Sequence, residues 1–225
     1  MTLPFCTKAI FSFPETIQSI PNIRKKKCLE IGLPLRASLF QASKQDAKSF
    51  FGFNSHRKVL LVFGGSLGAR SLNEKIFALV PELCGMCNVI HIVGRNNSNP
   101  QIEHENYRQY EFLTKEMKLA YAIADFAICR AGASSIFELS AARIPMILVP
   151  LGTHASRGDQ IINAKIFEKK GWAVWYEEST LTNEKILASV NECLTHLEER
   201  KAALETAPSR NAAEKISEML GHYLK

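Results

Sequence analysis

The sequence lacks the long apolar run and the leader of membrane-spanning or secreted proteins. Its longest apolar stretch, residues 145–151, is far shorter than the roughly 20 residues that a bilayer requires. Residues 1–13 contain no basic leader and carry Lys8 inside their apolar part, unlike a secretory signal. No disulfide framework is visible either, because the six cysteines are scattered through apolar segments. These absences predict a cytoplasmic protein.

A metal cluster and a redox pair are also missing. Cys84 and Cys87 form one C-x-x-C, but no second pair and no H-x3-5-H spacing completes a zinc site. A thioredoxin-type pair follows a strand and opens a helix, whereas this pair is expected to end a helix. The sequence therefore predicts neither a metal site nor redox chemistry.

Charge and length narrow the class further. Lys and Arg outnumber Asp and Glu by 28 to 22, and the densest basic run is residues 24–27. This excess suits phosphate-bearing ligands, anionic lipid or nucleic acid. No nucleic-acid motif accompanies the basic run, so we expect no nucleic-acid partner. The 225 residues, 46% of them apolar, can build a core and correspond to one and a half domains of about 150 residues.

From residue 58 onward, short apolar runs alternate with amphipathic segments. The expected strands are residues 58–63, 88–93, 110–113, 126–129, 145–151 and 172–176. The expected helices are residues 72–83, 116–124, 135–143 and 159–170, followed by two terminal amphipathic helices. This alternation predicts an α/β fold with a Rossmann-like, doubly wound parallel sheet of about six strands. Residues 1–57 do not join the rhythm and are expected to be a leader or linker.

Functional residues should follow the carboxyl ends of these strands. The first such loop contains Gly64, Gly65 and Ser66, and glycines there let a phosphate approach the backbone. It is neither the dinucleotide fingerprint nor a P-loop. It does fit the G-x-S-x-G elbow of serine hydrolases, with Ser66 as nucleophile, and a tight turn without any ligand is a further alternative. A hydrolase triad would need Asp125 or Asp159 together with His196.

Two further loops are polar, and each can be interpreted as structural or as ligand-binding. Ser135 and Glu138 form a capping-box spacing, yet the same small-residue turn could hold a diphosphate while Glu138 accepts ribose hydroxyls. In the loop after residue 150, His154 or Arg157 could meet phosphate. Asp159 and Gln160 could bind sugar hydroxyls, or Asp159 could simply be an N-cap.

Taken together, these loops resemble those of the MurG family. Two upstream segments, Phe13-Pro14-Glu15-Thr16 and Gly32-Leu33-Pro34-Leu35-Arg36, are similar to the segment that joins the two domains of that family. Five motifs then follow in the family order: Gly64-Gly65-Ser66-x-Gly68-Ala69-Arg70, Met117-x3-Tyr121-Ala-x-Ala-Asp125, Arg130-Ala-Gly-Ala133-x4-Glu138, Pro145-x4-Pro150 and Asp159-Gln160-x2-Asn163-Ala164. The family comprises bacterial GT-B glycosyltransferases that add N-acetylglucosamine to lipid I, forming lipid II for peptidoglycan.

The resemblance implies a UDP-GlcNAc-binding domain that uses no metal or other cofactor and inverts the anomeric carbon. Its glycine loop would meet the diphosphate, Leu113 the uracil, Glu138 the ribose and Gln160 the sugar. The implied UDP-GlcNAc-binding residues are Arg36, Gly64, Gly65, Ser66, Leu113, Met117, Arg130, Gly132, Ala133, Ser134, Ser135, Glu138, Asp159, Gln160 and Asn163. The family pattern has Gln-Gln where this chain has Asp159-Gln160, so the chain departs from the family at the predicted sugar contacts.

The resemblance also predicts an organisation. Residues 1–36 would be the remnant of an acceptor domain with its linker, and residues 37–225 the UDP-sugar-binding domain. No residue matches the general base of the family, so no catalytic residue is assigned. Turnover on lipid I would need an acceptor domain that is missing or a separate subunit, with peripheral attachment to the inner face of the membrane. A non-catalytic nucleotide-sugar-binding module is the remaining alternative.

Overall fold

The computed structural model describes residues 5–18, 20–53, 56–65, 69–152, 158–207 and 211–222. The chain divides into two compact units, a smaller one with residues 1–37 and 208–225 and a larger one with residues 38–207. The functional labels predicted for residues 1–36 and 37–225 stay predictions.

The smaller unit contains a two-stranded parallel sheet. β1 (Ala9–Phe11) pairs with β2 (Cys28–Glu30), and two short helices, α1 (Pro14–Gln18) and α2 (Asn22–Lys25), lie in the connection. α11 (Ala212–Gly221) belongs to the same unit. Sequence analysis predicted no elements before residue 58, because strands of three residues are too short to show a period.

The larger unit is built on a six-stranded parallel sheet, as predicted. The strand order is β5-β4-β3-β6-β7-β8, and every neighbouring pair is parallel. The strands are β3 (Val59–Phe63), β4 (Asn88–Ile92), β5 (Tyr107–Tyr110), β6 (Phe126–Cys129), β7 (Met146–Leu148) and β8 (Ala173–Trp175). The third strand, β5, therefore begins and ends three residues earlier than predicted, and β7 is shorter than predicted. All five residues of β3 are buried, as expected of a central strand covered on both faces.

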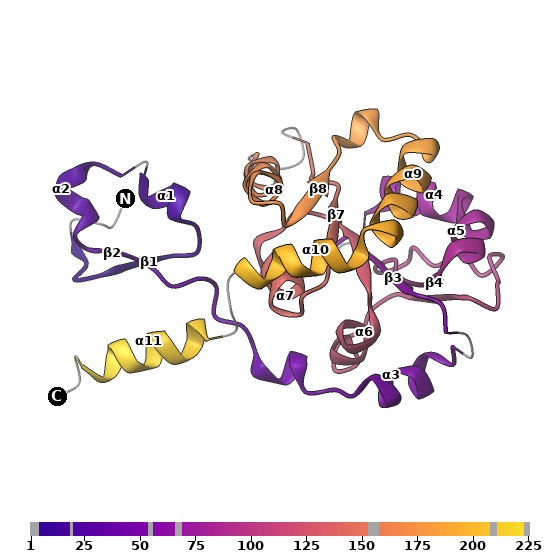
Figure 1. Ribbon diagram of the computed structural model, residues 1–225, viewed down its shortest axis with the longest axis horizontal. Coiled ribbons are helices and arrows are strands. Elements are labelled where there is room, and N and C mark those ends of the chain that lie inside the picture. The colour runs from indigo at the N-terminus through magenta and orange to yellow at the C-terminus, as the bar shows by residue number, and fades with distance from the viewer. Residues whose placement is uncertain are drawn as a thin grey trace. The chain divides into compact units, whose positions relative to one another are not determined.

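Helices cover both faces of this sheet (Figure 1). The helices of the larger unit are α3 (Lys44–Phe51), α4 (Arg70–Ala78), α5 (Val80–Met86), α6 (Met117–Ile123), α7 (Ala133–Ala141), α8 (Asp159–Lys169), α9 (Asn183–Thr195) and α10 (Leu197–Ala203). Right-handed crossovers place α4 and α5 on one face and α6, α7 and α8 on the other. α4, α5 and α9 share one hydrophobic cluster, which includes Leu72, Ile76, Leu83, Ile186 and Val190.

α3 is an element that sequence analysis missed. Its start is fixed by Ser43, whose side chain accepts a hydrogen bond from the Asp46 amide, and its end by Gly52 in the left-handed conformation. The helix lies within residues 1–57, which were predicted to be a leader or linker. Its polar residues form its exposed face, while Ala47 and Phe51 are buried.

The sheet reverses its direction of growth between β3 and β6, which lie side by side at its centre. The chain leaves β3 toward β4 and leaves β6 toward β7, so the loops after β3 and β6 separate to opposite faces. In doubly wound sheets, ligands bind in the crevice that such a switch opens at the carboxyl ends. The topology therefore makes Gly64–Gly65 and the loop that begins at Arg130 the candidate ligand-binding loops.

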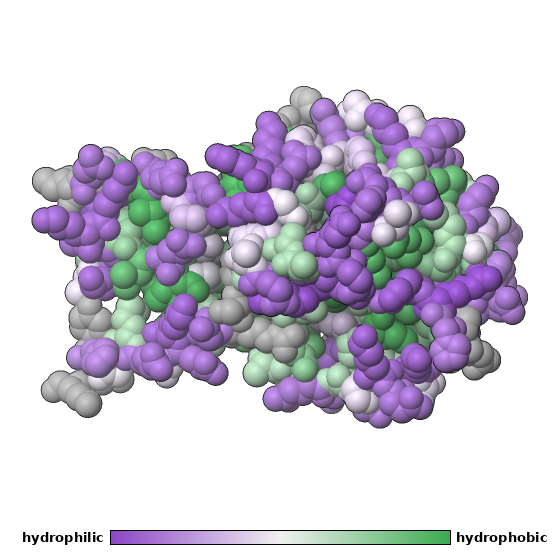
Figure 2. All heavy atoms as spheres, viewed as in Figure 1, coloured by the Kyte–Doolittle hydropathy of each residue, from purple (hydrophilic) through white to green (hydrophobic). Residues whose placement is uncertain are grey.

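The surface of the larger unit is mainly polar. On the face drawn in Figure 2, hydrophilic side chains cover most of it. Its exposed large hydrophobic residues, Phe50, Phe112 and Ile162, come from three different elements, which is ordinary for a folded domain. Within the described ranges, no helix combines the length and the apolar character needed to cross a bilayer.

Candidate functional site

The loop after β3 has the backbone freedom that a close ligand requires. Gly65 adopts φ +133°, a conformation that residues with a side chain rarely adopt. A Cβ built at Gly65 would meet no heavy atom within 4 Å, so the space around it is open. Ser66, the candidate nucleophile and phosphate contact, lies outside the described residues together with residues 67 and 68. Its role stays a prediction.

The loop after β6 leads directly into a helix with uncapped N–H groups. α7 begins at Ala133, its N-cap is Gly132, and no side chain caps it. The capping-box alternative for Ser135 is therefore wrong, because the N-cap lies three residues earlier than that motif requires. The backbone N–H groups of the first turn, residues 133–135, have no intrahelical acceptors and form a place where an anion can bind.

Glu138 is oriented by a tyrosine rather than by the helix start. Its Oε2 accepts a hydrogen bond of 2.6 Å from the hydroxyl of Tyr121, a residue of α6 that is 5% exposed. Oε1 has no hydrogen-bond partner among the described residues. A carboxylate with one oxygen held and one available is suited to accept hydroxyl donors from a ligand.

Replacing Tyr121 by phenylalanine should show how much this hydrogen bond contributes. We expect the free energy of unfolding to fall by about 1–2 kcal/mol, because a hydrogen bond to an ionised carboxylate is lost. Urea denaturation would measure it. Tyr110→Phe is the matched control, since no hydrogen bond of the Tyr110 hydroxyl exists in the described structure. An equal loss in both variants would contradict the assigned contact.

Two of the predicted UDP-GlcNAc-binding residues on α8 hold the neighbouring backbone. Gln160 accepts a hydrogen bond of 3.0 Å from the Leu151 amide through Oε1, and Asn163 donates one of 3.0 Å from Nδ2 to the Ala131 carbonyl. Asn163 is only 8% exposed, so it joins α8 to the loop after β6 from within the protein.

Asp159 is the first residue of α8 and is exposed, while the N-cap is Gly158 at φ 80°. The interpretation of Asp159 as N-cap is therefore wrong. His154 and Arg157 lie outside the described residues. Whether Asp159 contacts a sugar stays a prediction.

Arg130 anchors a buried charged network at the carboxyl edge. Its Nη1 donates to the Val149 carbonyl at 3.0 Å, and its Nη2 donates to Glu178 Oε1 at 2.6 Å and to the Ser71 hydroxyl at 3.3 Å. Ser71 donates to the same Glu178 oxygen. The Arg130 side chain is 6% exposed, and its Nε is buried without a partner in the described structure.

The carboxylate of Glu178 stays ionised in this setting. Partial burial alone would raise its pKa, but hydrogen bonds from Arg130 and Ser71 outweigh burial and lower the pKa of the carboxyl. Glu178 begins the short 3-10 helix η3 (Glu178–Thr180) after β8, and Ser71 lies in the first turn of α4. The network therefore connects the helix that follows the glycine loop to the ends of β6, β7 and β8.

Sequence analysis named Arg130 but missed both of its side-chain partners. Glu178 is 48 residues and Ser71 is 59 residues away from it along the chain, and neither belongs to a motif. The remaining predicted contacts divide between the two units. Leu113 and Met117 lie half-buried at the turn from β5 to α6, whereas Arg36 is exposed in the smaller unit.

A second buried polar chain fixes the orientation of α4. Asn73 donates to the Val93 carbonyl through Nδ2 at 2.8 Å, so its Oδ1 is left to accept from His91 Nε2 at 3.0 Å. His91 is thus the Nε2–H tautomer, and its Nδ1 accepts from the Tyr107 hydroxyl at 2.8 Å. Burial lowers the pKa of His91 to about 3, so the imidazole is neutral.

Fold and site together define a doubly wound α/β domain with open glycine positions and an uncapped helix start at the carboxyl edge of its sheet. Residues 59–220 match the glycosyltransferase family 28 C-terminal domain, and the chain belongs to this family. The predicted kinship and fold class are thereby confirmed.

Curated relatives and solved structures agree with this assignment. The chain is 38% identical over 217 residues to the UDP-N-acetylglucosamine--N-acetylmuramyl-(pentapeptide) pyrophosphoryl-undecaprenol N-acetylglucosamine transferase of Lachnoclostridium phytofermentans, covering 96% of this chain and 60% of the relative. The enzyme of the same name from Clostridium tetani is 36% identical over 224 residues, 99% of this chain and 62% of the relative. The chain thus spans about 60% of the length of these relatives.

Among solved structures, Acinetobacter baumannii MurG superposes with a TM-score of 0.70 at 25% identity, covering 97% of this chain and 62% of that one. The calicheamicin glycosyltransferase CalG4 superposes with a TM-score of 0.64 at 15% identity, over 97% of this chain and 55% of that one, which shows a shared fold.

The serine-hydrolase alternative is not supported. Asp125 is bound at the start of β3, where its Oδ2 accepts from the Val59 amide at 2.9 Å, while Ser66 follows the opposite end of that strand. His196 pairs with Glu199, at 3.1 Å, three residues further along the chain. Asp125 and His196 therefore do not belong to the carboxyl edge that follows β3, and His196 is required by the triads with either aspartate.

Proposed function

We propose that this chain binds UDP-N-acetylglucosamine at the carboxyl edge of the larger unit, as the donor half of a glycosyltransferase that forms lipid II. The observation that carries the proposal is the pair of open, glycine-containing loops at the topological switch between β3 and β6, followed at once by helices. The donor and the acceptor are those in the names of the family relatives.

The predicted residues would contact different parts of the donor. The N–H groups around Gly65 and at residues 133–135 would hold the diphosphate together with Ser66, and the contact predicted for Arg36 of the smaller unit stays a prediction. Glu138 would accept the ribose hydroxyls, because Tyr121 already holds one of its oxygens and leaves the other available. Leu113 and Met117 would border the uracil, and Asp159 and Gln160 would lie at the sugar.

Two other predicted contacts would position the loops of the site. Arg130 donates to Val149 and Glu178, and Asn163 donates to Ala131. The predicted independence of metals and other cofactors stays a prediction, as does the absence of a nucleic-acid partner.

The reaction proposed is an inverting displacement. An acceptor hydroxyl attacks the anomeric carbon of the sugar, the bond from that carbon to the diphosphate oxygen breaks, and UDP departs with the electron pair. Helix N-termini and backbone N–H groups at the diphosphate would stabilise the charge that develops on it. The general base and the lipid I site would come from an acceptor domain, and attachment to the inner face of the membrane would come with it.

Calorimetry with UDP-N-acetylglucosamine tests donor binding. We expect saturable binding, weakened at least tenfold (about 1.4 kcal/mol) in Glu138→Gln, because a neutral amide accepts ribose hydroxyls less strongly. Glu82→Gln, an exposed glutamate of α5, is the matched control and should bind like the parent chain.

Absence of binding at millimolar ligand, from protein shown to be folded, would overturn the proposal. If donor binds but no acceptor domain of the family restores transfer when added in trans, the chain is a nucleotide-sugar-binding module instead. Radiolabelled transfer to a lipid I analogue separates these outcomes.

A further inference from the structure

A second concave site lies at the opposite, amino-terminal edge of the same sheet. It is a pocket of about 190 Å3, lined by His56 and by the charged side chains of Lys44, Lys48, Arg57, Lys58 and Asp125. The two lysines are one turn apart on α3, residues 56–58 lead into β3, and Asp125 immediately precedes β6. Phe53 and Ile123 give the pocket an apolar side.

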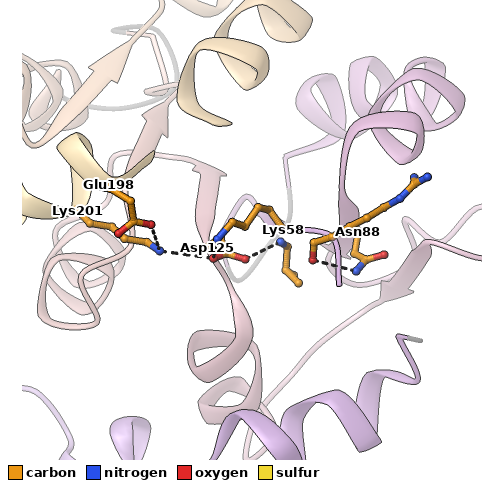
Figure 3. A network of polar contacts seen from close by, with 7 residues as sticks. Lys58, Asn88, Asp125, Glu198 and Lys201 are labelled. Carbon is orange, nitrogen blue, oxygen red and sulfur yellow. Dashed lines mark hydrogen bonds and ion pairs between the residues drawn. The ribbon is translucent and has the colours of Figure 1, made fainter. Parts of the chain in front are cut away.

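The single carboxylate of the pocket is already engaged (Figure 3). Asp125 Oδ2 accepts from the Val59 amide, and Oδ1 lies 3.5 Å from Lys58 Nζ and 3.5 Å from Lys201 Nζ. Lys201 also pairs with Glu198 at 3.3 Å. The negative charge of Asp125 is thus divided between two lysines and a backbone N–H group.

Three other cations of the pocket have no acidic partner. Within the described residues, no carboxylate forms an ion pair with Lys44, Lys48 or Arg57. Arg57 donates to two carbonyls at the end of α5, to Cys84 at 2.6 Å and to Gly85 at 3.3 Å, which fixes the guanidinium without neutralising it. Together with Lys58, the pocket carries four formal positive charges against one negative charge.

The elements that carry these cations are firmly held. The end of α3 is clamped by Arg108, which donates to the Phe51 carbonyl at 2.8 Å and to the Gly52 carbonyl at 3.0 Å. The same guanidinium stacks over Phe53 at 5.1 Å. The other side of the pocket is formed where β3 and β4 begin, at Val59 and Asn88. The end of α3 and the Arg57 guanidinium are thus held in place, which lowers the entropic cost of binding a compact anion there.

We propose that this amino-edge pocket binds a compact anion with two phosphate groups, a site distinct from the donor site. A single phosphate carries about −1.5 to −2 at neutral pH, so two phosphates match the excess of three positive charges better than one. The pocket adjoins the start of β3, and the donor site follows its end, so both sites can be filled together. This inference does not depend on the proposed donor function.

Pyrophosphate titration of the full chain tests the site. We expect amide NMR signals of Val59 and Asn88 to shift with saturation, and the dissociation constant to rise at least tenfold in Lys44→Gln/Lys48→Gln. Lys165→Gln/Lys169→Gln removes two exposed lysines with the same helical spacing from α8 and should change binding less than twofold. Signals of Gly65 and Gly132 report separately on the donor site, so failure of one proposal is distinguishable from failure of the other.

Three results would overturn the proposal. The first is saturation confined to the signals of Gly65 and Gly132. The second is equal weakening by the two lysine pairs, which would reduce the effect to net charge. The third is binding to phosphatidylglycerol vesicles that requires Lys44 and Lys48 while pyrophosphate causes no shift, which would make the pocket part of a membrane-contacting surface.

Discussion

Replacing Glu178 by alanine is expected to lower the free energy of unfolding by about 3 kcal/mol, because it leaves the buried Arg130 guanidinium without its carboxylate. The Arg130 side chain is 6% exposed and that of Glu178 26%, so water can reach the glutamate but hardly the arginine. The hydrogen bond from Ser71 is lost in the same step. Urea denaturation followed by tryptophan fluorescence measures the loss, since both tryptophans, Trp172 and Trp175, belong to the larger unit.

The adjacent Glu177 provides the control. Its side chain is exposed and forms no ion pair in the described structure, so Glu177→Ala should change stability by less than about 0.5 kcal/mol. The double variant Arg130→Met/Glu178→Met removes both charges and should lose less stability than Glu178→Ala, because no buried charge is left unpaired. Similar losses in Glu177→Ala and Glu178→Ala would show that the network contributes little.

Acidification should destabilise the larger unit through His91. Its pKa is about 3 in the folded protein against 6.5 for an ordinary histidine, so below pH 6.5 the unfolded chain takes up a proton that the folded chain refuses. Stability therefore falls as the pH is lowered from 6.5 toward 3. The His91 contribution should reach about 3 kcal/mol between pH 7 and pH 4, at 1.36 kcal/mol per pK unit.

Substitution separates the contribution of His91 to the pH dependence from that of other titratable groups. The lowered pKa of Glu178 also makes stability fall with acid, so the difference between the parent chain and His91→Gln is the informative quantity. Glutamine cannot take up a proton, and His91→Gln should remove most of the slope between pH 6 and pH 4. His222→Gln, an exposed histidine outside the larger unit, is the control. An unchanged slope in His91→Gln would contradict the assigned burial.

Much of the larger unit could be predicted because its signals are local. A run such as residues 59–63 is apolar at every position, which only a strand covered on both faces tolerates. The loops after β3 and β6 were recognisable because glycine next to a helix start has few other uses. The capping alternatives for Ser135 and Asp159 were wrong for a local reason: a glycine, three residues before Ser135 and directly before Asp159, is the N-cap of each helix.

Other features had no signal in the pattern of residues. α3 was missed because its apolar face is narrow, and its bounds depend on two caps, Ser43 and Gly52. The tyrosine that orients Glu138 lies 17 residues before it on another helix. Gln160 accepts a hydrogen bond from the Leu151 amide. The spacing of residues in the sequence does not distinguish such a side chain from one that contacts only a ligand.

The sequence by itself determined the alternation of strands and helices, the family, and the loops at which a donor would bind. These follow from hydrophobic period and from glycine, which act over a few residues. Only the tertiary structure decided which charges meet, because pairs such as Arg130 with Glu178 and Asp125 with Lys201 form only when segments distant in the sequence come together. The amino-edge pocket has the same origin, since α3 and the starts of β3 and β4 carry its lining and only the folded sheet brings them together.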